Sequence, residues 1–127
     1  MNKLLIMLLL IPLLFINIPP YIELNNLAII EEIGIIQNKE NYTLYLKEII
    51  PIKEDNSIKY EYKYYEFTNK NIKSCLEEIN KNTKKTIYLN KVKTIYTNKN
   101  INIKKELGIK PNSIKITNKD IKSLLKN

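Results

Sequence analysis

Two apolar stretches joined by a short polar segment constrain this chain more than any other feature. The segment from Leu24 to Pro51 reads LNNLAIIEEIGIIQNKENYTLYLKEIIP. Its second half is rich in β-branched and aromatic residues, and residues 37–41 have the composition of a turn. The pattern predicts a β-hairpin that forms the hydrophobic nucleus of the fold. We expect Pro51 to end the second strand, because proline cannot donate a hydrogen bond to a ladder.

Length and composition limit what can be built around this hairpin. The chain has 127 residues, enough for one domain, and its single cysteine excludes an internal disulfide or a multi-cysteine zinc site. All 21 basic residues are lysines, and the net charge is +8. A basic domain suits anionic lipid, a cell-wall polymer or nucleic acid, but without arginine we expect no specific reading of nucleic acid. The scattered lysines favour a solvated surface.

The N-terminus has the pattern of an export leader. Lys3 precedes an apolar run from Leu4 to Ile16, and no small-residue cleavage pattern follows it. Counted on to Ile22, the segment approaches the length of a spanning helix. We predict a signal anchor over residues 1–20, in contact with the membrane through residues 4–18, in preference to a cleaved signal peptide and a secreted domain. Residues 21–127 would then form a single domain outside the cytoplasm.

A row of tyrosines follows the hairpin. After a polar loop over residues 51–57, a strand is predicted over residues 58–67, because residues 58–64 alternate strictly between an aromatic face and a charged face. Ile58, Tyr60, Tyr62 and Tyr64 form the aromatic face. Aromatic rows can serve as ligand platforms, so Tyr60, Tyr62 and Tyr64 are the candidate binding residues. We favour packing of this row against the core or a neighbouring strand.

The rest of the chain alternates helical and strand patterns. A helix is predicted over residues 72–79, capped by Asn69 or Asn71 and burying Cys75. The later predictions are a strand over 87–97 that is an edge strand or bulged, a short helix over 101–107 ended by Gly108, a strand over 113–117, and a helix capped by Asn118. This order indicates an α+β domain with a largely antiparallel sheet of four or five strands and two or three helices, preceded by the membrane or signal helix.

Residues that could perform chemistry are sparse. The sequence has no histidine, and Cys75 is predicted to lie on an apolar helix face with no base beside it. Glu31-Glu32 and Glu77-Glu78 are consecutive pairs, whose side chains diverge on a strand or a helix. We therefore predict no catalytic residue, no metal ligand, no cofactor and no small-molecule substrate, and hence a protein that is not an enzyme.

Short motifs resemble the N-terminal part of spore germination proteins of the Ger(x)C type, the C subunits of nutrient germinant receptors. The motifs are Glu23-Leu24-Asn25-Asn26-Leu27, Ile33-Gly34-Ile35, the helix over residues 72–79, and Tyr88-Leu89-Asn90-Lys91-Val92-Lys93. The chain departs from the family at Ile36, where the family has Asp, at Lys91, where it has His, and in lacking the lipid-bearing cysteine. The resemblance implies a non-enzymatic component at the outer face of a membrane that works through partner subunits.

Two functions follow from these observations. The leading hypothesis is a membrane-anchored module outside the cytoplasm that acts by protein–protein contact, with membrane protein subunits as its partners. The alternative is a basic exported module that binds an anionic cell-wall or membrane polymer through its lysines. A third interpretation is an exported domain with no biochemical activity of its own.

Overall fold

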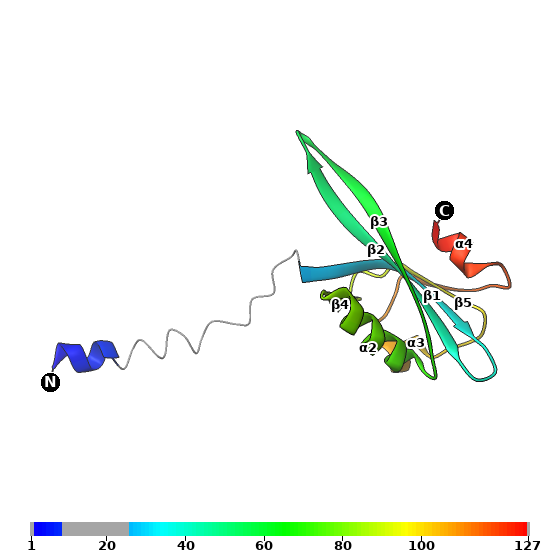
Figure 1. Ribbon diagram of the computed structural model, residues 1–127, viewed down its shortest axis with the longest axis horizontal. Coiled ribbons are helices and arrows are strands. Elements are labelled where there is room, and N and C mark those ends of the chain that lie inside the picture. Colours follow the sequence, from blue (N-terminus) through cyan, green and yellow to red (C-terminus); the bar gives the residue numbers. More distant parts are fainter. Residues whose placement is uncertain (1, 9–25, 127) are drawn as a thin grey trace.

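The computed structural model describes residues 2–8 and 26–126, and residues 26–126 form an α+β domain around a mixed sheet of six strands (Figure 1). The elements in chain order are β1 Leu27–Gln37, β2 Tyr42–Glu54, β3 Ser57–Asn69, α2 Ile72–Thr83, β4 Thr86–Tyr88, β5 Thr94–Thr97, α3 Ile103–Leu107, β6 Ser113–Ile116 and α4 Ile121–Lys126. The main sheet has the order β3-β2-β1-β5-β6, and β4 pairs with β1 beside it.

Only part of the predicted leader lies within the described residues. Residues 3–8 are helical, whereas residues 9–20 of the predicted anchor lie outside the part of the chain that the structure describes. Among the described residues, no helix has the length and apolar character needed to cross a membrane.

The predicted hairpin is confirmed. β1 and β2 pair antiparallel from Ile30↔Glu48 to Gln37↔Tyr42, and Asn38 donates its N–H to the Asn41 carbonyl across the turn, at 2.8 Å. The expectation that Pro51 ends the second strand is wrong. β2 continues to Glu54, but it has left β1 by then, so Pro51 stands where β2 has one free edge and a missing N–H is tolerated.

A β-bulge explains how β1 buries so many apolar residues on one face. The register with β2 shifts between Ile30 and Glu32, so one extra residue is inserted at Glu31. The insertion reverses the alternation of side chains. Ala28 and Ile30 before it therefore face the same layer as Ile33 and Ile35 after it, and all four are fully buried.

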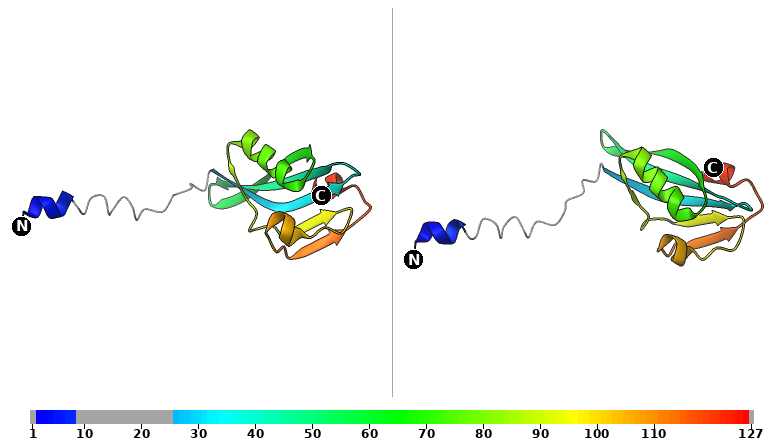
Figure 2. Two further views of the ribbon diagram at one scale, coloured as in Figure 1. Left: turned by 90° about the horizontal axis from the view of Figure 1, so that it is seen from below. Right: turned by 60° about the horizontal axis from the view of Figure 1, so that its bottom comes forward.

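Helix α2 covers this buried face of the sheet. Asn71 caps it, because its side-chain oxygen accepts a hydrogen bond from the Ser74 N–H at 2.8 Å. Its apolar side, Ile72, Cys75 and Ile79, is buried as predicted. α2 contacts β2 and β3 and lies across that part of the sheet (Figure 2). The main core of the domain therefore lies between α2 and the sheet.

The single strand predicted over residues 87–97 is replaced by two short strands, β4 and β5. Both run parallel to β1, with Leu27↔Thr86 and Glu32↔Thr94 as their first pairs. The break between them lies opposite the bulge, where the Lys93 N–H donates to the Glu31 carbonyl at 2.8 Å. β6 is also parallel to its neighbour β5. The sheet is thus mixed, with two antiparallel and three parallel pairings, and not largely antiparallel.

Helix α4 packs on the opposite face of the sheet, and Gly34 permits its approach (Figure 1). A Cβ atom at Gly34 would collide with Ile121 and come within 3.2 Å of Leu125. The predicted cap, Asn118, is wrong by two residues. The carbonyl of Asp120 accepts the first helical hydrogen bond, from the Leu124 N–H, and its side chain accepts from Ser123. Gly108, by contrast, ends α3 as predicted, with φ at 67°.

Beyond its last pair with β1, β2 continues with β3 as a two-stranded ribbon, here called the ribbon and comprising residues 49–62. It extends away from the helices (Figure 1). The polar loop predicted over residues 51–57 is reduced to a two-residue turn at Asp55 and Asn56, with φ of 44° at Asp55. Only these two residues form a turn, and the flanking residues of the predicted loop belong to the strands.

Candidate functional site

The candidate tyrosines lie on the ribbon and at its base, on one face of β3. We call Ile58, Tyr60, Tyr62 and Tyr64 the tyrosine face. Their exposed fractions are 61%, 56%, 44% and 38%, falling toward the body of the domain. The expected packing of this row against the core is therefore wrong, because the buried face of β3 is the one that carries Tyr65 and Phe67. Packing against a neighbouring strand is confirmed, since Tyr62 lies opposite Ile49 and Tyr64 opposite Lys47.

Lysine side chains accompany two of these rings. The Lys47 ammonium lies 4.5 Å from the centre of the Tyr62 ring, and that of Lys126 lies 5.8 Å from the Tyr64 ring. A cation–π contact is worth about 0.5–1 kcal/mol at an exposed site such as that of Lys126, and more where the cation is buried, as it is in Lys47. Lys47 also approaches Glu32 at 3.9 Å. The aromatic row is thus bordered by cations.

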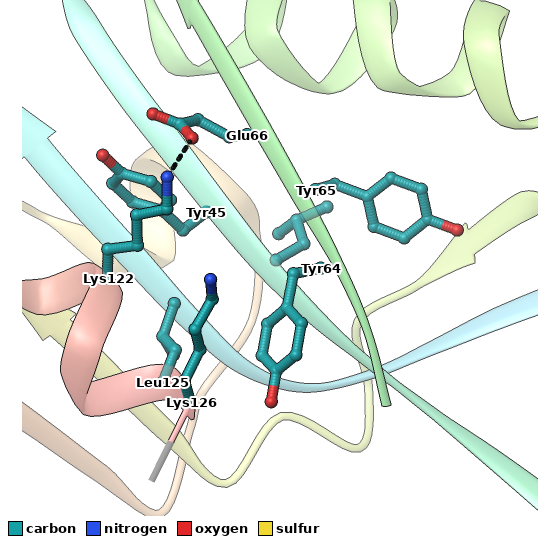
Figure 3. A pocket seen from close by; sticks show the side chains of 8 residues that line it. Tyr45, Tyr64, Tyr65, Glu66, Lys122, Leu125 and Lys126 are labelled. Carbon is teal, nitrogen blue, oxygen red and sulfur yellow. Dashed lines mark hydrogen bonds and ion pairs between the residues drawn. The ribbon is translucent and has the colours of Figure 1, made fainter. Parts of the chain in front are cut away.

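A small cavity of about 230 Å³ lies where the tyrosine face meets α4 (Figure 3). Its lining residues are Tyr45, Leu46, Tyr64, Tyr65, Glu66, Lys122, Leu125 and Lys126. Lys122 crosses it to Glu66 at 3.1 Å, so one of its two lysines already has a carboxylate partner. Burial, followed by the nearby Glu66 carboxylate, raises the pKa of the Tyr45 phenol. The volume is below the roughly 300–1,000 Å³ of ordinary ligand pockets, which favours a contact surface over a small-molecule site.

The residues considered for catalysis are spread apart. Glu31 pairs with Lys93 at 3.3 Å, whereas Glu32 turns to Lys47, so these neighbours do not converge. Residues 2–8 and 26–126 contain no group of three or more side chains arranged to hold a metal ion. Cys75 lies in the core, with its sulfur 3.5 Å from the Tyr42 carbonyl.

Cys75 should resist alkylation in the folded chain and react fully in denaturant. Its side chain is fully buried, and burial raises the pKa of the thiol, so little reactive thiolate forms near neutral pH. Mass spectrometry after incubation with iodoacetamide measures the modified fraction. A Ser57→Cys variant supplies an exposed control thiol at the tip of the ribbon. Alkylation of Cys75 at the rate of the control would contradict the buried position.

A buried polar cluster was missed in the sequence. Glu48 is 1% exposed, accepts a hydrogen bond from the Tyr65 hydroxyl at 2.7 Å and pairs with Lys85 at 3.1 Å. Burial, with a further contribution from the bond to Glu48, raises the pKa of Tyr65 well above its usual range. The alternation of β2 could have revealed it, because Glu48 falls on the same face of the strand as Leu44 and Leu46, which are buried. The cluster fastens the segment after α2 to the base of the ribbon.

Comparisons with models of protein families, with curated proteins and with solved structures find no significant match. The resemblance to germinant-receptor C subunits therefore stays a prediction from the sequence.

Proposed function

We propose that this chain is a non-enzymatic, membrane-anchored module outside the cytoplasm that acts by binding another protein through its tyrosine face. The observation that carries the proposal is the exposure of four large apolar side chains in one row, from Ile58 to Tyr64. Contiguous exposed apolar surface marks interaction sites, and tyrosine is enriched in protein interfaces. Burial of these rings in an interface would recover hydrophobic free energy that the isolated domain does not gain.

The surroundings of the row suit a protein partner with acidic side chains. The exposed Lys126 lies against the ring of Tyr64, so a cation borders an apolar centre. An apolar centre with a polar border is the usual anatomy of a protein interface. The β2–β3 pairing is continuous from Tyr42↔Asn69 to Glu54↔Ser57, so a ladder of backbone hydrogen bonds supports the rings. That support limits the entropy lost on binding.

The membrane anchor and the class of partner come from the sequence. The apolar run from Leu4 to Ile16 supports the anchor, and the resemblance to germinant-receptor C subunits supports partner subunits in the same membrane. An anchored domain meets a membrane partner at high effective concentration, so a surface of modest size suffices.

The net charge of +8 favours a second candidate function, the binding of an anionic wall or membrane polymer. In the described part of the chain, five lysines already pair with carboxylates: Lys47, Lys59, Lys85, Lys93 and Lys122. These pairs reduce the cationic surface that is free to face a polymer, so we rank this function second.

Cross-linked capture from solubilised membranes tests the proposal. The full chain is compared with a Tyr60→Ser/Tyr62→Ser/Tyr64→Ser variant and with Ile114→Ser/Ile116→Ser, which removes exposed apolar side chains of β6 instead. We expect the wild type and the β6 control to retain the same membrane protein at high salt, and the tyrosine variant to lose it, because apolar contacts are insensitive to screening. Each variant is first checked for an unchanged melting temperature.

The same chains are then mixed with vesicles of anionic lipid and with wall polymer at low and high salt. Polyanion binding weakens steeply as salt rises. The proposal would be overturned in favour of the second function if all three chains bound the vesicles or the wall polymer equally, bound them only at low salt, and captured no membrane protein.

A further inference from the structure

The outer edge of β3 is long and unprotected. Within residues 26–126, β3 pairs only with β2, so the backbone groups along its other edge have no strand partner. β3 has 13 residues, its pairing with β2 shows no bulge, and it contains no proline. Proteins usually shorten, bulge or charge such an edge to prevent pairing with another chain. The opposite edge follows that rule, because β6 has four residues.

The charges on β3 alternate in sign instead of repelling a second strand. Lys59, Glu61 and Lys63 follow one another on one face of the strand, and Tyr60, Tyr62 and Tyr64 alternate with them on the other. We propose that two copies of this chain pair edge to edge along β3, as an antiparallel ladder with its two-fold axis at Tyr62. The occupant of the free edge is therefore a second copy of the same strand.

The pairing of side chains across the ladder favours this register over the registers with the axis one residue away. With the axis at Tyr62, Glu61 of each copy lies opposite Lys63 of the other, and Tyr60 lies opposite Tyr64. Opposite charges and aromatic pairs across a ladder each contribute favourably. With the axis at Glu61, that carboxylate would face itself and Lys59 would face Lys63. With the axis at Lys63, two ammonium groups would meet. A parallel pairing in register would place every charge opposite its own kind.

The ends of the register are also acceptable. Residues 57–67 of one copy face residues 67–57 of the other, so Lys59 meets the Tyr65 ring. Ile58 falls opposite Glu66, which is the least favourable pair, although Glu66 already has Lys122 as its partner at 3.1 Å. A two-fold axis perpendicular to the sheet keeps equivalent faces on the same side. The two tyrosine faces would thus join into one surface, although the inference itself rests on the edge of β3 and not on the proposed function.

Disulfide trapping tests the axis directly. At a two-fold axis, residue 62 faces itself across about 4.5–5.5 Å between Cα atoms, within the range that a disulfide spans. Residue 60 would be roughly 13 Å from its own copy, which is too far. We expect the purified full chain with Tyr62→Cys to form a covalent dimer on mild oxidation, and Tyr60→Cys to remain monomeric. Wild type serves as the control for Cys75, which is buried. Equal cross-linking of both variants, or none with Tyr62→Cys, would overturn the proposal.

Charge reversal tests the register without a new cysteine. Glu61→Lys places two lysines opposite each other twice in the dimer, so we expect about tenfold weaker dimerisation by analytical ultracentrifugation. Glu61→Lys/Lys63→Glu restores opposite charges across the axis and should restore the dimer. Residues 61 and 63 are both exposed, so we expect neither variant to disturb the fold. Circular dichroism of each variant checks this. A double variant as weak as the single one, or a wild type that stays monomeric, would refute this pairing.

Discussion

Replacing Ile33 with aspartate will unfold the domain. Ile33 is fully buried at the centre of the sheet, between β2 and β5, where it pairs with Leu46 and Ile95. The substitution removes about 1.5–3 kcal/mol of apolar burial and places a carboxylate where no cation lies among its strand neighbours. Because domains of this size are stable by only about 5–15 kcal/mol, the sum leaves little or no folded protein at 37 °C. Circular dichroism during heating measures the effect.

A matched substitution separates burial from the chemistry of the change. Ile116→Asp introduces the same carboxylate in β6, where the side chain is 60% exposed, and should shift the melting temperature little. Leu46→Asp, on the partner strand and fully buried, should behave like Ile33→Asp. A melting curve of Ile33→Asp that matches that of Ile116→Asp would exclude the proposed core.

Local sequence signals predicted the elements that local interactions determine. Three of them depend only on residues that are close together in the sequence. They are the turn at residues 38–41, the Asn71 cap of α2 and the glycine that ends α3. The buried position of Cys75 followed from helical periodicity alone. Such elements can therefore be predicted from the sequence alone.

Pairings between distant segments were not readable in the same way. The bulge at Glu31 forms only against β2, and it reverses the alternation of β1 halfway along the strand. The split of residues 87–97 follows from that bulge, because β4 and β5 pair with β1 on either side of it. Alternation within residues 87–97 cannot report a break whose cause lies about 60 residues earlier in the chain. The parallel direction of β5 and β6 also depends on the path of the segments that connect the strands, which alternation within a strand does not show.

The candidate surface was found in the sequence, but its environment was not. Strict alternation placed Tyr60, Tyr62 and Tyr64 on one face, and the structure keeps them there. Alternation does not say which face is covered, and here the core covers the other face only at the end of β3, at Tyr65 and Phe67. The ribbon passes beyond β1, so no element of the described domain shields its tyrosines. Long-range topology therefore determines whether an aromatic row becomes core or contact surface.

Replacing Lys85 with methionine should destabilise the domain by about 3 kcal/mol, the lower end of the range for breaking a buried ion pair. Lys85 is a third exposed, whereas its partner Glu48 is almost completely buried. The variant leaves the Glu48 carboxylate with the Tyr65 hydroxyl as its remaining hydrogen-bond partner in the described structure. Urea denaturation of wild type and variant, followed by tyrosine fluorescence, gives the difference in the free energy of unfolding.

Two further variants decide whether that loss comes from the buried charge. Lys93→Met breaks the pair with Glu31, a more exposed pair in which the side chains are 67% and 17% exposed, and should cost at most about 1 kcal/mol. Glu48→Gln added to Lys85→Met removes the uncompensated charge but keeps an oxygen that accepts from Tyr65, so stability should partly return. Glu48 is also the last residue of β2 in register with β1, at the base of the ribbon. Hydrogen exchange in Lys85→Met should therefore accelerate first in residues 49–62, and equal losses in Lys85→Met and Lys93→Met would show that the cluster does not hold the ribbon.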